Sequence, residues 1–230
     1  MLNPRTAAAH VYVSSVDEPV LEPSDRHHLE RVLRLRAGAE ITVGDGRGRW
    51  RPAVLGTDLE PRGTVVSEAE ARPVLTVGFA VVKGDRPDLV VRALTEVGID
   101  RIVPLHCARS VVRWTGDRRQ EAVERLRRVV RSAGMQSRRV WLPEVTDVRE
   151  LGDLLEDGGD VALAVPGAIE AVDRSTVLVG PEGGWTPEEL AIGDRSVARV
   201  GLGPHVLRSE TAAIAAGVLL VAAFRRPSRP

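Results

Sequence analysis

Short, mainly apolar runs alternate with longer segments of helical periodicity from residue 74 onward. The apolar runs are typical of buried strands and cover 74–82, 101–107, 160–165, 175–180 and 198–203. Helices are expected between them, over 85–99, 117–134, from 187, and over 209–224. A chain that alternates in this way folds as an α/β domain on a mostly parallel sheet.

Residues 1–72 follow a different pattern, with short strands and turns. Strands are expected within 10–13, 39–55 and 63–70, and "GDGRG" at residues 44–48 supplies a hairpin turn. One short helix is expected over 24–35, with Ser24 or Asp25 as its N-cap. The sequence therefore predicts a small β-barrel-like domain over 1–72 and an α/β domain over 73–230, joined near 71–74.

Two loops rich in glycine and proline follow the last two predicted strands. In "GPEGGWTPEEL" (180–190), Thr186 and Glu189 form a capping-box pattern and Pro187 suits the first helical position. In "GLGPHVLRSE" (201–210), Ser209 can cap the next helix. The carboxyl ends of parallel strands are where open α/β sheets bind ligands, and glycines let a flat ligand approach the backbone. A turn required only by geometry is the alternative.

The two loops lack the motifs that bind phosphate groups, and this restricts the type of ligand. Neither loop contains a lysine, and the chain has no GxxxxGK[ST] or GxGxxG pattern. The two loops together therefore favour a nucleoside-like ligand over a nucleoside triphosphate.

The charge of the chain is zero overall but unevenly distributed. Residues 101–141 contain eleven arginines against three acidic residues, a net charge of +8. Residues 142–199 contain thirteen acidic residues against four arginines, a net charge of −9. The basic segment either presents a face to an anionic polymer or is a solvated helix of an arginine-rich protein.

The single cysteine, Cys107, excludes a disulfide framework and a cysteine-based metal site. No apolar run approaches the roughly 18 residues of a membrane span, and residues 1–13 lack a signal-peptide core. We therefore expect a cytoplasmic protein that needs neither a membrane nor a metal.

The two loops carry a resemblance to a known family. "LVGPEGGWTPEEL" (178–190) followed by "VGLGPHVLRSETAAIAA" (200–216) resembles the paired signature loops of the RsmE-type ribosomal RNA methyltransferases, which belong to the SPOUT class. Further similar segments are "HHLERVLRLRAGAEITVGDGRG", "KGDRPDLVVRALTEVGIDRIVPLHCARSV" and "GMQSRRVWLPEV", so that the resemblance extends over the whole chain. Two positions depart from it: Met135 stands where glutamate is frequent, and Arg92 where lysine is common.

The resemblance implies a fold and a reaction. The fold would be a C-terminal SPOUT domain with a trefoil knot behind a PUA-like RNA-binding domain, assembled as a homodimer. The reaction would be methyl transfer from S-adenosyl-L-methionine to N3 of a uridine in the 16S rRNA of the small ribosomal subunit. Two alternatives stay open: an RNA-binding ribosome-assembly factor without methyl transfer, and a SPOUT methyltransferase acting on tRNA, a ribose 2′-hydroxyl or another RNA site.

The resemblance also implies roles for residues of the two loops. Arg208 would stabilise the uracil anion, while Glu210, with Glu182 behind it, would help to remove the N3 proton. For Glu210 the alternative is a charge that complements the helix dipole, and for Arg208 an ion pair. The implied cofactor contacts are Leu178, Gly180, Pro181, Gly183, Gly184, Leu202, Gly203, Val206, Leu207, Thr211 and Ala212. The implied RNA contacts are Arg31, Arg34, Arg36, Arg109, Arg113, Arg138 and Arg139.

Overall fold

The computed structural model describes residues 2–156, 160–191 and 197–225. Its residues form two compact units: Met1–Ala71 with Arg131–Leu142, and Arg72–Val130 with Pro143–Pro230. The sequence-based division at residue 72 did not anticipate the second segment of the first unit. No helix among the described residues is long and apolar enough to span a membrane.

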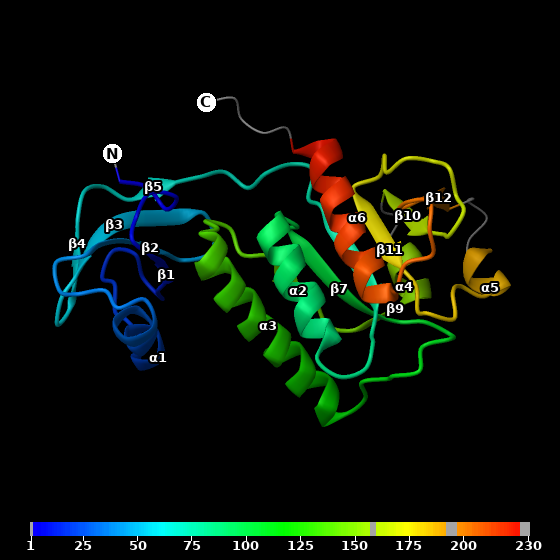
Figure 1. Ribbon diagram of the computed structural model, residues 1–230, viewed down its shortest axis with the longest axis horizontal. Coiled ribbons are helices and arrows are strands. Elements are labelled where there is room, and N and C mark those ends of the chain that lie inside the picture. Colours follow the sequence, from blue (N-terminus) through cyan, green and yellow to red (C-terminus); the bar gives the residue numbers. More distant parts are fainter. Residues whose placement is uncertain (1, 157–159, 192–196, 226–230) are drawn as a thin grey trace. The chain divides into compact units, whose positions relative to one another are not determined.

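The second unit is built on a parallel sheet, as the alternating pattern predicts (Figure 1). The strand order is β12-β10-β11-β6-β7-β8, and β9 also pairs with β7. The register places Val77 of β6 between Val177 and Ile102, and all three side chains are fully buried. The strands are β6 (Thr76–Ala80), β7 (Arg101–His106), β8 (Glu144–Val145), β9 (Arg149–Glu150), β10 (Val161–Ala164), β11 (Thr176–Val179) and β12 (Ala198–Val200).

Five helices belong wholly or partly to this unit: α2 (Arg86–Val97), α3 (Asp117–Ser137), α4 (Leu151–Glu156), α5 (Pro187–Leu190) and α6 (Ser209–Phe224). As predicted, α2 stops at Gly98, whose φ of 115° is left-handed. Helices α2 and α6 lie side by side (Figure 1), and Gly217 of α6 packs closely against Leu94 of α2. A Cβ atom there would lie 2.5 Å from Leu94 Cδ2, so this contact requires glycine.

Helix α3 does not end at Gly134, which the sequence suggested as its stop. It continues to Ser137, and Arg138 follows with a left-handed φ of 58°. Gly134 instead serves packing, because a Cβ atom there would overlap the Leu142 side chain and lie 2.7 Å from the Tyr12 hydroxyl. A glycine inside a helix usually costs about 1 kcal/mol relative to alanine, and this close packing offsets that cost.

The first unit is a small mixed sheet in the order β1-β2-β3-β4, with β5 paired to β3. As predicted, "GDGRG" joins β2 to β3, with Gly46 and Gly48 at positive φ. The core contains Val11, Ile41 and Val43, and Met135 packs against it. The strands are β1 (His10–Tyr12), β2 (Glu40–Gly44), β3 (Arg49–Leu55), β4 (Leu59–Pro61) and β5 (Val66–Ser67).

The helix expected over 24–35 is shorter and differently capped. Helix α1 (Pro23–His27) is followed by a π-helical turn, η1 (His28–Val32), and its N-cap is Glu22. Asp25 is buried rather than capping, and it accepts two hydrogen bonds from Arg131, at 2.9 and 2.6 Å. Arg131 also donates to the Tyr12 carbonyl. A carboxylate buried in this way is stable only with such a partner, and the pair raises the pKa of Arg131.

Candidate functional site

A pocket lies where β10, β11 and β12 end, as expected for a parallel sheet. It is formed by the first loop (180–186) and the second loop (201–208), with part of the segment after β10. The lining is mostly apolar with bare backbone. Its residues are Ala164, Val165, Pro166, Val179, Gly180, Pro181, Glu182, Gly184, Trp185, Leu190, Leu202, Gly203, His205, Val206, Leu207, Ser209 and Ala212.

Eight of the eleven residues that were expected to contact a cofactor line this pocket, and three do not. Leu178 is fully buried in the hydrophobic core, and Gly183 and Thr211 are outside the lining. The other residues line the pocket: Gly180, Pro181, Gly184, Leu202, Gly203, Val206, Leu207 and Ala212. Sequence reasoning missed Trp185 and Ser209, although an aromatic side chain directly after two glycines was a usable signal.

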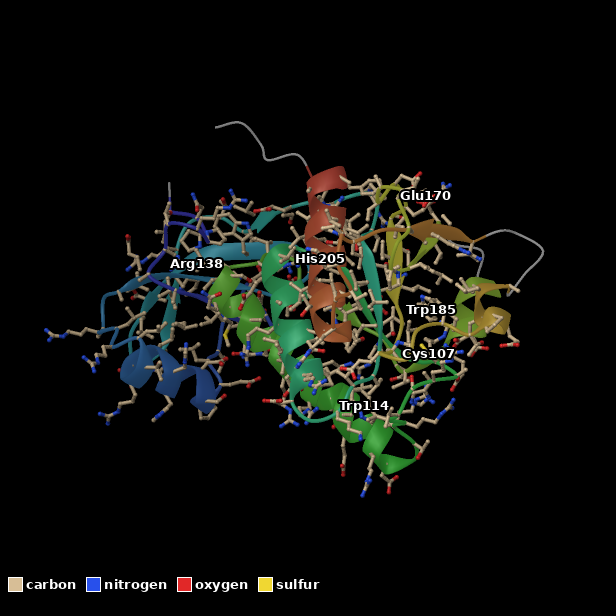
Figure 2. All side chains as sticks on the ribbon, turned by 45° about the vertical axis from the view of Figure 1, so that its right-hand side comes forward. Cys107, Trp114, Arg138, Glu170, Trp185 and His205 are labelled. Carbon is tan, nitrogen blue, oxygen red and sulfur yellow. The ribbon has the colours of Figure 1, made fainter. Side chains whose placement is uncertain are left out.

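Trp185 forms one wall of the pocket. Its indole Nε1 donates a 3.0 Å hydrogen bond to the carbonyl of Ala164, at the end of β10. A Cβ atom at residue 180 would lie 2.9 Å from the indole ring, so Gly180 is required for packing against Trp185. Trp185 and Cys107 share one core cluster and lie close together in Figure 2. Burial raises the pKa of the Cys107 thiol to about 12.

Ser209 connects the two loops. Its hydroxyl donates a 2.9 Å hydrogen bond to the carbonyl oxygen of Gly180, and the side chain is buried. The expectation that Ser209 caps α6 was wrong, because Arg208 occupies the N-cap position and its side chain makes no capping hydrogen bond. Ser209 instead provides a hydrogen-bond donor for the carbonyl of Gly180 at the end of β11. The position of the serine in the sequence does not reveal this role.

The capping box of α5 is confirmed. Thr186 Oγ1 accepts from the Glu189 amide at 3.2 Å, and Glu189 Oε2 accepts from the Thr186 amide at 2.8 Å. The other carboxylate oxygen of Glu189 accepts from the Ala108 amide at 2.8 Å. Arg109, the next residue, donates to the carbonyls of Gly183 and Trp185 at 2.9 and 3.2 Å. The segment after β7 therefore holds the first loop at several points.

Glu182 of the first loop and Glu210 in the first turn of α6 share a cation that sequence reasoning missed. Arg86 Nη1, at the start of α2, lies 3.2 Å from Glu182 and 3.8 Å from Glu210. The Glu210 side chain is only 13% exposed, and its Oε2 atom has no hydrogen-bond partner among the described residues. Arg208 is exposed and forms no ion pair with any described residue, so its guanidinium is available.

Most arginines of the basic segment 101–141 have internal partners. Arg138, labelled in Figure 2, donates to the carbonyls of Pro4, Arg5, Ala7 and Ala8, and Arg139 donates to that of Trp141. Arg113 pairs with Glu150 at 3.7 Å. Nine of the eleven arginines bond or pair in this way: 101, 109, 113, 119, 125, 127, 131, 138 and 139. These contacts indicate that most arginines of the segment bind other parts of the same protein, which argues against a continuous basic face for an anionic polymer.

Three of the arginines expected to contact RNA lie outside the basic segment 101–141. Arg31, Arg34 and Arg36 follow α1 and are exposed, with no ion pair to any residue in the described ranges. His27 and His28 are exposed beside them, and so are Val32 and Leu33, at 61% and 44%. Arg92, one of the two departures from the family pattern, is exposed on α2.

Comparisons with known proteins match both units. A family model described as an RNA methyltransferase domain matches residues 69–221, and an RNA methyltransferase PUA domain model matches residues 21–57. The chain is 33% identical to ribosomal RNA small subunit methyltransferase E of Mycobacterium tuberculosis, over 86% of this chain and 83% of that protein. It is 27% identical to the enzyme of the same name from Bacillus subtilis, over 81% and 82%.

The fold comparison agrees with these matches. The crystal structure of a ribosomal RNA small subunit methyltransferase E from Neisseria gonorrhoeae, bound to S-adenosyl methionine, superposes with a TM-score of 0.76. It is 25% identical, and the alignment covers 94% of this chain and 98% of that chain. The sequence matches, the SPOUT-type parallel sheet and the PUA-like first unit all agree, and the chain belongs to the RsmE-type family of RNA methyltransferases.

Proposed function

We propose that this protein transfers the methyl group of S-adenosylmethionine to N3 of a uridine in the 16S rRNA of the small ribosomal subunit. The observation that carries the proposal is the pocket built by the first and second loops at the carboxyl edge of the sheet. The curated relatives are named as ribosomal RNA small subunit methyltransferases, and the Neisseria neighbour holds S-adenosyl methionine.

The pocket residues fit this cofactor. Adenine is flat and mainly apolar, and the lining offers Trp185, Leu190 and Val206 together with backbone groups of both loops. Gly184 and Gly203 have positive φ, and the space that a Cβ atom would occupy at either residue is open. Side chains there would be strained and would narrow the approach to the backbone. When bound, the cofactor supplies an activated methyl group on its sulfonium.

The charged residues at the pocket rim are suited to handling the uridine. N3 must lose its proton before or during methylation, and the candidate acceptors are the carboxylates of Glu182, which lines the pocket, and of Glu210, which follows the lining residue Ser209. Arg86 holds the two carboxylates together and offsets their mutual repulsion. Arg208, which lies between the lining residues Leu207 and Ser209, would stabilise the negative charge that develops on the base.

RNA would be bound by the first unit, as its PUA-like class implies. Arg31, Arg34 and Arg36 offer unpaired guanidinium groups suited to phosphates, among exposed histidines. The domain limits that we propose are an RNA-binding domain over about 1–72 and a catalytic domain beyond it; the break between the compact units at residues 71 and 72 supports this boundary, although residues 131–142 group with the first unit. Because ribosomal RNA is the proposed substrate, the protein would act in the cytoplasm.

The proposed assembly is a homodimer of knotted catalytic domains. Helix α6 exposes Val218 and Leu219 (48% and 37%), followed by exposed Ala222 and Ala223, so that one apolar side of the helix is uncovered. For the trefoil knot, the support is the path of the chain. It leaves β11 for the edge strand β12 and then returns to place α6 against α2. Sedimentation equilibrium tests the dimer, and Leu219→Asp should yield monomers.

The proposed reaction is tested by incubating the purified protein with labelled S-adenosylmethionine and either naked 16S rRNA or small subunits. Mass mapping of the digested RNA should find one N3-methyluridine, and Glu210→Gln should lower its rate of formation. Label at a ribose 2′-hydroxyl or in tRNA would support another SPOUT activity. Cofactor binding without any transfer to RNA, or a fully retained N3-methyluridine in cells lacking the protein, would overturn the assignment.

A further inference from the structure

We propose that Arg109 is a positioning residue that shapes the S-adenosylmethionine pocket, and not an RNA contact; this inference rests on the proposed function. Arg109 lies in the segment after β7, which contributes no lining residue. Its Nη1 atom donates to two carbonyls of the first loop, those of Gly183 and Trp185, at 2.9 and 3.2 Å. One guanidinium group therefore bridges two points of the loop.

The bridged stretch includes a tight turn of the first loop. Gly184 lies between the two carbonyls with a φ of 69°, and its amide donates to the Pro181 carbonyl at 2.8 Å. A left-handed residue next to another glycine has many alternative conformations in solution. The Arg109 guanidinium binds the carbonyls on both sides of the bend and thereby stabilises one of these conformations.

The aliphatic part of Arg109 also packs on the loop. A Cβ atom at residue 183 would lie 3.4 Å from Arg109 Cβ and 3.5 Å from Arg109 Cδ. The side of Gly183 that a Cβ atom would occupy therefore faces the arginine, and Gly183 is not among the lining residues. Gly183 therefore packs against Arg109 and does not line the pocket, which differs from the cofactor contact that the sequence suggested.

The segment that carries Arg109 is itself held in place. Its neighbour Ala108 donates to Glu189, and the Cys107 amide donates to Ser110 Oγ at 3.0 Å. Farther along, the Trp114 amide donates to His106 Nε2 at 3.0 Å. Arg109 therefore extends from a well-anchored segment, which is what a positioning residue requires.

The effect reaches the pocket through Trp185. Arg109 binds the backbone carbonyl of this residue, and the indole ring of the same residue packs against Gly180 and lines the pocket. If the bend between 183 and 185 relaxes, the ring loses its fixed position beside Gly180. The cofactor then has to order the loop when it binds, and its affinity falls.

The experiment measures binding of S-adenosylmethionine by calorimetry and binding of a 16S rRNA fragment by anisotropy, for Arg109→Ala, Arg109→Lys and wild type. We expect Arg109→Ala to weaken cofactor binding about tenfold, as the loss of hydrogen bonds from a charged donor allows. Arg109→Lys should bind with intermediate affinity, since one ammonium group does not reproduce the planar donor array. The KM for the cofactor should rise while kcat at saturation changes less than about twofold.

Arg101→Ala is the matched control. Arg101 stands at the opposite end of β7 and pairs with Glu144 at 2.8 Å, so its loss should leave cofactor affinity unchanged.

Three kinds of outcome would decide against the proposal or its basis. Unchanged cofactor affinity in Arg109→Ala, or an equal loss in Arg101→Ala, would overturn the positioning role. A loss of RNA affinity alone, rescued by Arg109→Lys, would assign Arg109 to the RNA instead. Absence of cofactor binding to the wild-type chain would overturn the proposed function itself, a result that is distinct from the other two.

Discussion

Ser209 Oγ donates a 2.9 Å hydrogen bond to the carbonyl oxygen of Gly180, which joins the start of α6 to the end of β11. Both residues line the pocket, although 29 positions separate them in the chain. The bond fixes the distance between the two loops at their bases, while Arg86 links their acidic side chains at the rim.

Replacing Ser209 with alanine should weaken S-adenosylmethionine binding about fivefold, because a buried carbonyl without its donor costs roughly 1 kcal/mol. Calorimetry measures the change. Ser137→Ala is the matched control, since Ser137 also donates to a carbonyl, that of Ala133 at 2.7 Å, and does not line the pocket. Equal affinities of Ser209→Ala and wild type would show that the two loops are held together by other contacts.

Replacing Arg86 with alanine should reduce the methylation rate at least tenfold, because Glu182 and Glu210 would lose the cation between them. Arg86→Lys should recover part of the rate. Loss of the exposed Arg86–Glu182 pair (40% and 61%) should lower the free energy of unfolding by less than about 1 kcal/mol, and the loss of the cation beside Glu210, which is 13% exposed, should add to this. Single-turnover kinetics and thermal unfolding separate these effects, and a full rate in Arg86→Ala would exclude Arg86 from the mechanism.

The stability of the first unit should depend on pH through His10. Burial, assisted by the charge of Arg138, lowers the pKa of His10 from 6.5 to about 4. Between these two values the unfolded chain binds a proton that the folded chain does not, so stability is complete above pH 6.5 and falls as the pH decreases towards 4. At pH 5 the loss should be about 2 kcal/mol.

Urea unfolding at pH 7.5 and pH 5 tests this dependence, with His10→Asn as the comparison. Asparagine can still bond to Thr42, whose hydroxyl lies 2.9 Å from His10 Nδ1, but it does not titrate. The variant is expected to be less stable at both pH values and to lose less stability on acidification. The same acid-induced loss in both proteins would show that other groups, such as carboxylates, cause it.

Replacing Arg31, Arg34 and Arg36 together with glutamine should weaken binding of a 16S rRNA fragment and reduce its salt dependence. The slope of log K against log salt is negative, and each lost phosphate contact should reduce its magnitude by about 0.7–0.9. The comparison is Arg118→Gln/Arg128→Gln, which changes two exposed arginines of α3 that have no ion pair within the described part of the chain. A larger loss of RNA affinity in that double variant would indicate that the RNA binds along α3 instead.

Local signals in the sequence predicted much of the fold. The apolar runs predicted the parallel strands β6, β7, β10, β11 and β12 but not the two-residue strands β8 and β9, and the capping box at Thr186 and Glu189 marked the start of α5. The "GDGRG" hairpin and the helix stop at Gly98 were predicted for the same reason. In each case the residues that determine the structure are neighbours in the chain.

Residues whose partners are distant in sequence were interpreted wrongly or missed. Gly134 reads as a helix stop, but its role depends on Tyr12, and Asp25 reads as a cap, but it pairs with Arg131. The same holds for the site: the loops were found from their glycines, whereas Arg86 and Trp185 were not found. No periodicity reveals that an arginine at the start of α2 reaches two later loops.

The state of Cys107 has a practical consequence for biophysical work on this protein. It is the single cysteine of the chain, it is buried, and its thiol has a pKa of about 12. Maleimide reagents attack the thiolate, which is almost absent from such a group at neutral pH. A cysteine introduced at an exposed position, such as Val111 at 80% exposure, can therefore carry a fluorophore or spin label without first removing the native thiol.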